Sequence, residues 1–296
     1  MQRRLLFLLN PRAGVQKGQP LLQLIQQKCE AAGIAYAIEH TRADADYSIL
    51  KEKIKAEQMT DVIIAGGDGT ISAVTAGLRG LPVYFGIIPR GSGNGLALAA
   101  GISKDPAKAL EIILNGKAQP VDGFMINDRF SCMLSGIGFD AQVAHDFDRQ
   151  SKRGFWKYTQ LTLKNLASIK PYAFKLKAKN IDLSVKAYFI SIANSNQFGN
   201  HFTIAPKASL QDGLLDIVAV EKKNLFSVLL HIIWHIRFGT FTHDFKKRGS
   251  ITYFQTSELM IQNPEMAPFH IDGDGKETAA QFTVKIVPAA YSLLMP

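Results

Sequence analysis

Two carboxylates flank a glycine near the C-terminal end of the chain, in the run His270-Ile271-Asp272-Gly273-Asp274-Gly275. Phosphoryl transfer to an alcohol needs a carboxylate that accepts the hydroxyl proton, together with Mg²⁺ on the phosphates of a nucleotide. Asp272 and Asp274 are therefore candidate catalytic residues. A plain β-turn with two solvated acids is the alternative interpretation.

A glycine-rich turn follows a very apolar stretch, in the run Ile63-Ile64-Ala65-Gly66-Gly67-Asp68-Gly69-Thr70. The residues after it, 71–78, are typical of a helix start. A strand, a glycine turn and a helix aim backbone N–H groups at an anion, most often a phosphate. Asp68 would repel a phosphate unless a cation or a proton-transfer step accounts for it, so it is a third candidate catalytic residue. A tight turn with a solvated Asp68 is the simpler alternative.

Other polar turns also follow apolar runs in the first third of the chain. They are Asn10-Pro11-Arg12-Ala13-Gly14, the turn at Thr41, and Arg90-Gly91-Ser92-Gly93-Asn94-Gly95. Predicted strands and helices alternate between these turns: strands 5–9, 34–39, 61–65 and 83–88, and helices 19–32, 47–54 and 71–78. This alternation predicts a doubly wound, mostly parallel sheet that binds ligands at the carboxyl ends of its strands.

The composition changes near Gln119-Pro120-Val121-Asp122-Gly123. Beyond this run, short apolar segments alternate with turns, which is typical of all-β structure. The predicted strands are 130–137, 172–178, 181–193, 214–220, 251–254, 258–262 and 281–287. We therefore predict an α/β domain over residues 1–122 and a β-rich, sandwich-like domain over residues 123–287.

Three motifs together resemble the catalytic domain of the diacylglycerol kinase and sphingosine kinase superfamily. They are Asn-Pro-x-x-Gly from Asn10, Gly-Gly-Asp-Gly-Thr from Gly66, and Pro-x-Gly-Ser-Gly-Asn from Pro89. Gly-Gly-Asp-Gly alone also occurs in NAD kinases and phosphofructokinases, whose α/β domain is similar, but three motifs in this order are specific. The resemblance continues through the second half, in the runs 136–141, 192–194, 204–208, 212–216 and 271–274. It implies that residues 288–296 return to the first domain.

The resemblance implies an ATP-dependent lipid kinase that uses Mg²⁺ and phosphorylates the hydroxyl of a diacylglycerol-like or sphingoid lipid. The lipid head would enter between the domains, with its acyl chains in an apolar channel of the β-rich domain. Asp68 would orient the metal-bound phosphates or the substrate hydroxyl. The nucleotide would lie along the carboxyl edge of the sheet, against Asn10, Thr41, Gly66, Gly67, Asp68, Gly69, Thr70, Ile71, Ser72, Gly91, Ser92, Gly93 and Asn94.

The sequence departs from the family at the proton acceptor. The family has Asp-Gly-Glu where this chain has Asp272-Gly273-Asp274, so the role proposed for the Glu passes to Asp274, whose side chain is one methylene shorter. The resemblance also implies a structural Mg²⁺ held by the Asp212 side chain and the carbonyls of Ser209 and Leu214. Such oxygen ligands suit a hard cation. An Asx-type turn at Asp212 without a metal is the alternative.

Three rival functions remain open. A NAD kinase would share Gly-Gly-Asp-Gly-Thr and the two-domain plan, but would not be expected to have the other two motifs. A Rossmann oxidoreductase would need Gly-x-Gly-x-x-Gly after the first strand, where this chain has Asn10-Pro11. A non-catalytic lipid-binding module would bind the same lipids without consuming ATP. The lipid is also open, because Gly-Ser-Gly-Asn is closer to sphingosine and ceramide kinases than to bacterial diacylglycerol kinases.

Composition and charge favour some classes of binding partner and cell compartment over others. A formal charge of +9 and a pI near 9.4 favour an anionic partner, but no block of Lys and Arg resembles a nucleic-acid tail. Two cysteines make no disulfide framework, which favours a reducing cytoplasm. The apolar segment 222–248, with Lys222, Lys223, Lys246, Lys247 and Arg248, predicts a peripheral contact with anionic membrane headgroups. A core-packed segment is the alternative, and a homodimer is left open.

Overall fold

The computed structural model of the protein describes residues 2–11, 13, 19–42, 46–148, 169–199, 202–221 and 251–296. These residues form two compact units. Unit 1 consists of Met1–Asp122 with Ala289–Pro296, and unit 2 consists of Gly123–Pro288. The predicted membrane segment 222–248 lies outside the described residues.

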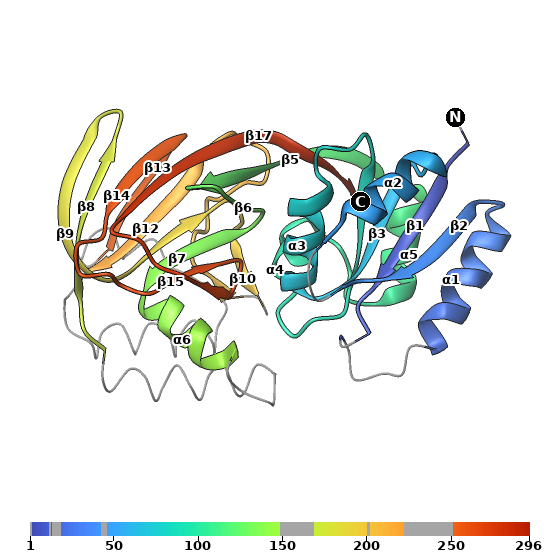
Figure 1. The fold of residues 1–296 in the computed structure, drawn as a ribbon, viewed down its shortest axis with the longest axis horizontal. Coiled ribbons are helices and arrows are strands. Elements are labelled where there is room, and N and C mark those ends of the chain that lie inside the picture. The colour runs from blue at the N-terminus through green and yellow to red at the C-terminus, as the bar shows by residue number, and fades with distance from the viewer. Residues whose placement is uncertain are drawn as a thin grey trace. The chain divides into compact units, whose positions relative to one another are not determined.

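Unit 1 is built on a parallel sheet (Figure 1). In the described part of the chain its strand order is β17-β4-β3-β1-β2, and every pairing is parallel. The strands are β1 (Arg4–Leu9), β2 (Ala35–His40), β3 (Asp61–Gly66), β4 (Tyr84–Pro89) and β17 (Gln281–Met295). Strand β3 is buried along its whole length, as expected for a central parallel strand that is covered on both faces.

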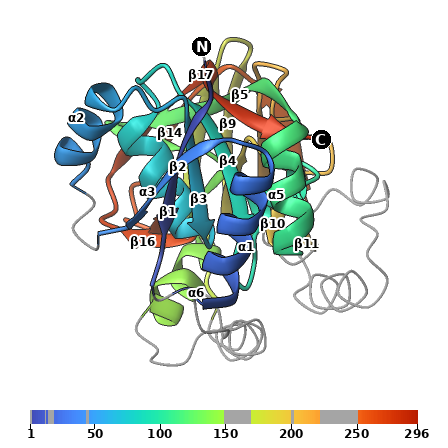
Figure 2. The ribbon, with the colours of Figure 1, turned by 90° about the vertical axis from the view of Figure 1, so that its right-hand side faces the viewer.

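Helices cover both faces of this sheet. They are α1 (Gln19–Ala31), α2 (Ser48–Ala56), α3 (Asp68–Leu78), α4 (Gly95–Ala99) and α5 (Pro106–Asn115). Figure 2 shows α1 and α5 on one face, with α2 and α3 on the other. Strand β1 is flanked by β2 and β3, so the direction of winding reverses between β1 and β3, which is where doubly wound sheets bind their ligands. The predicted doubly wound α/β fold is confirmed.

Unit 2 consists mainly of antiparallel strands. They are β5 (Lys117–Ile126), β6 (Arg129–Ser131), β7 (Leu134–Gly138), β8 (Tyr172–Ala178), β9 (Ile181–Ala193), β10 (Gln197–Gly199), β11 (Phe202–Thr203), β12 (Leu215–Glu221), β13 (Ile251–Thr256), β14 (Glu258–Gln262), β15 (Phe269–Ile271), β16 (Asp274–Lys276) and the first part of β17. One helix among the described residues, α6 (Phe139–Asp148), packs against β7, β15 and β16.

The long strand β9 belongs to two runs of strands. Its first part pairs with β8, which continues through β14 to β17, and its second part pairs with β7 and β12. Both runs contribute to one apolar core, for example Leu176 and Phe282 from the first and Ile137 and Ile217 from the second. A core enclosed between two strand layers confirms the predicted sandwich-like domain.

Several element boundaries differ from the sequence prediction. The composition change at residues 119–123, where no strand is predicted, falls inside strand β5. The predicted strand 130–137 is divided into β6 and β7. Helix α3 begins at Asp68, inside the glycine motif, since Gly67 is already extended (φ −94°, ψ −178°) and acts as the N-cap. Among the helices of the described residues, none is long and apolar enough to cross a membrane.

Candidate functional site

The predicted nucleotide edge of unit 1 is formed by the ends of four strands. The parallel register places Leu9 beside His40 and Ala65, and Gly66 beside Pro89. The turns that begin at Asn10, Thr41, Gly67 and Arg90 therefore leave the sheet along one edge.

Asn10 connects the first turn to the glycine motif. Its backbone N–H donates to the Ala65 carbonyl (3.0 Å), and its Nδ2 donates to Thr70 Oγ1 (2.7 Å). Gly66 makes room for that threonine, because a Cβ at Gly66 would lie 2.6 Å from Thr70 Cβ. The Thr41 N–H donates to the Leu9 carbonyl, which fixes the start of the neighbouring turn. Arg12 and Gly14 of the first motif lie outside the described residues.

The two glycine turns touch backbone to backbone. A Cβ on Gly67 would lie 3.0 Å from Gly91 Cα, and a Cβ on Gly91 would lie 2.6 Å from Gly67 Cα. The Arg90 N–H donates to the Gly66 carbonyl (2.8 Å), which closes the contact from the other side. Neither position has a positive φ. Both glycines are thus required for close approach rather than for a left-handed backbone.

Asn94 shapes its own turn. It takes the left-handed conformation (φ 54°), its Oδ1 accepts from the Gly91 N–H, and its Nδ2 donates to the Gly91 carbonyl, each at 2.8 Å. Its side chain is almost completely buried, so Asn94 supports the loop through these bonds. Ser92 is exposed on the same turn, and Gly93 is partly exposed.

Helix α3 starts at this edge and presents its N-terminus there. Asp68 and Gly69 are its first two residues and are partly buried, as is Ser72 one turn further along. The N–H groups of Thr70 and Ile71 both donate to the Gly67 carbonyl, and the Ile71 side chain is fully buried. Ile71 therefore anchors the helix to unit 1. The helix N-terminus and the extended Gly67 backbone are the parts suited to a phosphate.

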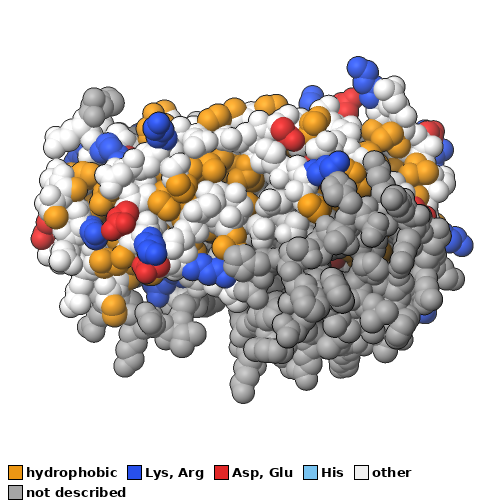
Figure 3. Space-filling model, turned by 180° about the vertical axis from the view of Figure 1, so that it is seen from behind, with side chains coloured by type: hydrophobic (Ala, Val, Ile, Leu, Met, Phe, Trp, Pro, Cys, Tyr) orange, Lys and Arg blue, Asp and Glu red, His pale blue; other side chains and the backbone are white. Residues whose placement is uncertain are grey.

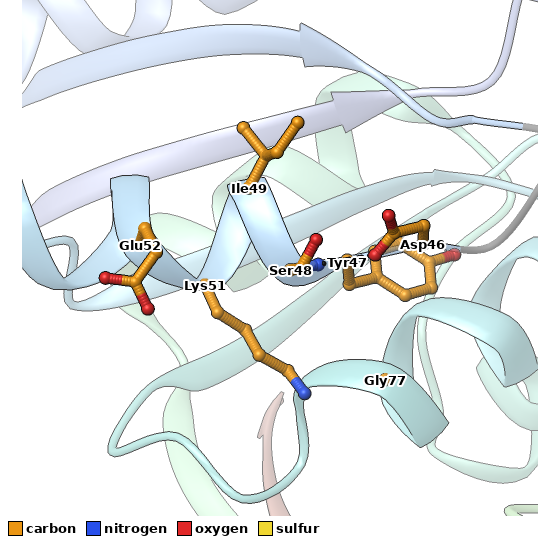
Figure 4. Close-up of a pocket in the computed structure, with 7 residues that line it drawn as sticks. All are labelled: Asp46, Tyr47, Ser48, Ile49, Lys51, Glu52 and Gly77. Atoms are coloured by element: carbon orange, nitrogen blue, oxygen red, sulfur yellow. Dashed lines mark hydrogen bonds between the residues drawn. The ribbon is translucent and has the colours of Figure 1, made fainter.

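A separate hollow lies beside the start of helix α2. Figure 4 shows it lined by Asp46, Tyr47, Ser48, Ile49, Lys51, Glu52 and Gly77. A Cβ on Gly77 would lie 2.2 Å from the Tyr47 ring, so this glycine lets the tyrosine pack against α3. None of the predicted site residues lines this hollow, and it contributes nothing to the nucleotide edge.

In unit 2, the two predicted acids lie on a tight β-hairpin. Strand β15 pairs with β16, with Ile271 opposite Asp274. The two residues between them, Asp272 (φ 49°) and Gly273 (φ 88°), both have positive φ. Positive φ at both central positions is the type I′ turn that joins antiparallel strands, and Asp-Gly is a preferred sequence for it.

Asp272 is surrounded by donors. Its side chain is 5% exposed, and its carboxylate accepts from Ser131 Oγ (2.7 Å) and from the backbone N–H groups of Cys132 (3.1 Å), Met133 and Leu134 (both 3.0 Å). Three consecutive N–H groups on one carboxylate hold this side chain in place. The contacts suit a residue that fixes the hairpin to the 131–134 segment.

Asp274 has the opposite environment. Its side chain is 52% exposed, and Lys276 Nζ lies 3.9 Å from its carboxylate. An exposed carboxylate can approach a substrate hydroxyl, whereas one that is enclosed by N–H donors cannot. Of the two predicted acids of the hairpin, Asp274 is the better placed to accept a proton.

Two residues that the sequence prediction did not single out for a role support this hairpin. His270 is fully buried, with Nε2 3.3 Å from Asp140 Oδ2 and Nδ1 accepting from the Gly273 N–H. His145 Nε2 donates to the Phe269 carbonyl (2.9 Å). Asp140 lies in one of the runs that match the family, but only the fold brings this helix residue to a strand 130 positions later.

The predicted metal turn has the geometry of an Asx turn. Asp212 is exposed, and its Oδ1 accepts from the Leu214 N–H at 3.1 Å. Ser209 uses its hydroxyl to accept from Gln211 N. One carboxylate and two carbonyls are oxygen ligands of the kind that Mg²⁺ takes, so the residues present fit the ion. No cluster of three or more His, Cys, Asp or Glu side chains suited to a metal occurs in the part of the chain that is described.

A buried acid lies close to this turn. Asp216 accepts from Gln255 Nε2 (3.2 Å) and from the Tyr253 hydroxyl. Burial raises the pKa of Asp216 above its ordinary value, although both hydrogen bonds act in the opposite direction. Burial and the bond to Asp216 likewise raise the pKa of Tyr253. Lys207 lies over the Tyr253 ring, 5.8 Å from its centroid.

Known protein families match the sequence of each unit. The diacylglycerol kinase catalytic domain family matches residues 4–126, and the YegS C-terminal NAD kinase beta sandwich-like domain family matches residues 134–295. A Bacillus subtilis (strain 168) protein named "Diacylglycerol kinase" is 26% identical over 279 residues, covering 92% of this chain and 90% of its own length. A Klebsiella pneumoniae (strain 342) protein named "Probable lipid kinase YegS-like" is 28% identical over 241 residues, covering 79% and 77%.

Solved structures share the fold. A diacylglycerol kinase structure from Bacillus anthracis str. Sterne superposes with a TM-score of 0.77, at 19% identity, over 100% of this chain and 97% of that one. The likeness at this identity is one of fold. The family matches together span nearly all of the sequence, in the order that the motifs predict. The chain therefore belongs to the family of diacylglycerol kinases and YegS-like lipid kinases.

Proposed function

We propose that this protein is an ATP-dependent lipid kinase that phosphorylates the hydroxyl of a diacylglycerol-like or sphingoid lipid. The observation that carries the proposal is the contact between the Gly67 and Gly91 turns at the carboxyl edge of the unit 1 sheet, beside the N-terminus of α3. Backbone without side chains at a helix N-terminus is the kind of surface that accommodates a polyphosphate. The names of the relatives support a lipid as the acceptor.

The proposed reaction assigns a role to each unit. Unit 1 holds the nucleotide, with Asp68 orienting its phosphates or the lipid hydroxyl. The hydroxyl oxygen bonds to the γ-phosphorus, the bond from that phosphorus to the bridging oxygen breaks, and Asp274 accepts the hydroxyl proton. Mg²⁺ bound to the nucleotide would neutralise charge on the phosphates. Asp212, with the carbonyls of Ser209 and Leu214, would hold a second, structural Mg²⁺.

The same proposal includes a peripheral contact with membranes, where such a lipid is found. Its support is the basic charge of the chain and the segment 222–248, whose apolar residues are flanked by Lys222, Lys223, Lys246, Lys247 and Arg248. The proposal also places the protein in the cytoplasm, where ATP is available as the phosphoryl donor.

The test is to incubate the purified protein with ATP, Mg²⁺ and a mixed lipid extract, and to identify the products by mass spectrometry. We expect one lipid class to gain the mass of a phosphoryl group, with equivalent ADP released. The matched control is the Asp274→Asn protein, which should give little product. Phosphorylation of NAD in a parallel incubation would favour a NAD kinase, and lipid binding without ADP release would favour a non-catalytic binding module.

A further inference from the structure

The hairpin that carries Asp274 is held by a buried histidine. His270 lies on β15, two residues before the turn, and both of its ring nitrogens have partners. A backbone N–H can only donate, so the bond from Gly273 N (3.3 Å) makes His270 Nδ1 an acceptor. In the neutral ring the hydrogen then lies on Nε2, which donates to Asp140 Oδ2.

The neighbouring strands have glycines where this arrangement needs space. A Cβ on Gly136 would lie 1.9 Å from Asp140 Oδ2 and 2.4 Å from His270 Nε2. A Cβ on Gly275 would lie 2.8 Å from the ring of His145. Both Asp140 and His145 belong to α6, so one helix holds the hairpin at two points through two histidines.

Gly273 is the residue between Asp272 and Asp274, and its N–H belongs to the central peptide of the turn. The Asp272 carboxylate fixes one side of that peptide to residues 131–134, and His270 fixes its N–H. The orientation of this peptide determines where the chain enters β16 and therefore where the first residue of β16, Asp274, points. An Asp side chain has one rotatable bond fewer than a Glu, so its carboxylate position depends more closely on the backbone.

We propose that His270 is a positioning residue for phosphoryl transfer: oriented by Asp140, it holds the Gly273 N–H so that Asp274 is fixed where it accepts the hydroxyl proton. This inference rests on the proposed function. Misplacement of a reacting group by about 1 Å can lower a rate by about 10²-fold, so a hydrogen bond that sets the turn affects turnover without touching substrate.

Two substitutions separate the roles of the two ring nitrogens. In His270→Asn, the amide Oδ1 takes the place of Nδ1 and still accepts from the Gly273 N–H, but the donor to Asp140 is lost. In His270→Gln, the amide Nε2 takes the place of the ring Nε2 and still donates to Asp140, but the acceptor for Gly273 is lost. We expect kcat to fall by about 10-fold or more in His270→Gln and by less than about 3-fold in His270→Asn, with the KM values for ATP and lipid unchanged. Equal losses in the two variants, or a change confined to KM, would overturn the proposal.

A double variant tests whether His270 acts through Asp274. Adding His270→Gln to Asp274→Asn should cause no further fall in kcat, because the group that His270 positions is already absent. A further fall as large as in the wild-type background would show that His270 acts on turnover by another route. Thermal unfolding of all four proteins establishes that the comparison is made between folded enzymes.

The contact itself can be measured without activity, which separates this inference from the proposed function. The Gly273 amide should be protected from hydrogen exchange in the wild type and in His270→Asn, and should lose protection in His270→Gln. The ¹⁵N shifts of the wild-type imidazole should show the hydrogen on Nε2, even if neither variant folds. A hydrogen on Nδ1 would overturn the positioning role. Absence of kinase activity with these signals intact would overturn the proposed function and leave only the contact.

Discussion

Asp272 and Asp274 are separated by one glycine but differ in nearly every contact. Asp272 accepts from a hydroxyl and three backbone N–H groups, while Asp274 is exposed beside Lys276. Replacing Asp272 by Asn would turn an NH₂ group toward N–H donors that it cannot satisfy. We expect Asp272→Asn to lower the free energy of unfolding by about 2–4 kcal/mol, measured by urea denaturation. An unchanged unfolding midpoint would show that these bonds contribute little.

The Asp274→Asn substitution should have the reverse effect. Because the side chain is half exposed and its ion pair with Lys276 is long, stability should change little. Turnover should fall by about 10²-fold or more, as expected when a positioned general base is lost, while ATP affinity measured by calorimetry stays near that of the wild type. Asp182→Asn is a matched control, since this exposed acid also pairs with lysines but lies at the start of β9 and outside the hairpin. Normal turnover in Asp274→Asn would shift the catalytic role to Asp68, since Asp272 is enclosed by N–H donors.

The buried Asp216 should make the free energy of unfolding depend on pH. Burial raises the pKa of Asp216 in the folded state. As the pH rises above the ordinary carboxyl pKa of about 3.9, the unfolded chain ionises first, so the contribution of Asp216 to stability falls until the folded-state pKa is passed. Relative to Asp216→Asn, the wild type should therefore lose stability over this window, as measured by urea unfolding at a series of pH values. A difference that is flat or grows with pH would contradict this.

At the scale of elements, the sequence predicts the parallel sheet of unit 1 better than it predicts the β15–β16 hairpin and the residues that hold this hairpin in place. Buried strands followed by glycine turns are visible as apolar runs, and β1, β2, β3 and β4 lie within a residue or two of their predicted bounds. Strand β5 is not predicted, because Pro120 and Gly123 are residue types that are depleted in strands. The His270–Asp140 pair could not be predicted, since it depends on packing between α6 and β15 rather than on local pattern.

The contact between the Gly67 and Gly91 turns should not tolerate a side chain at Gly67. Gly67→Val would bring branched carbons against the Gly91 backbone, which cannot move aside as a flexible side chain would. We expect separation of the β3 and β4 turns and loss of ATP binding in calorimetry. Gly80→Val is the matched control, because nothing lies within 4 Å of a Cβ at Gly80. ATP affinity that is unchanged in folded Gly67→Val protein would count against this edge as the nucleotide site.

At the scale of the whole molecule, charge predicts how the protein meets lipid. Figure 3 draws the face opposite to the one in Figure 1. On the described part of that face, Lys and Arg side chains are spread out rather than gathered in one patch. The chain carries a formal charge of +9, and each basic residue near an anionic membrane contributes about 1 kcal/mol, screened by salt. Activity on anionic vesicles should fall as ionic strength rises, while activity on a dispersed short-chain lipid should change little.

The segment 222–248 can be tested within the same assay. Replacing Lys246, Lys247 and Arg248 by Glu should lower vesicle binding at low salt to the level seen at high salt. Charge reversal without effect on vesicle binding, together with Trp234 fluorescence that does not respond to vesicles, would indicate that the segment packs within the protein instead.

Strand β17 has a consequence for how a newly made chain folds. Residues 289–296 belong to unit 1, where Ser292 and Leu293 pair with β4 and the ring of Tyr291 packs against Phe85. A ribosome makes all of unit 2 before it reaches these residues, which takes on the order of ten seconds or longer at roughly 5–20 residues per second. During that interval β4 is an open sheet edge, able to pair with another nascent chain. Unit 2 is thus the first of the two that can fold to completion.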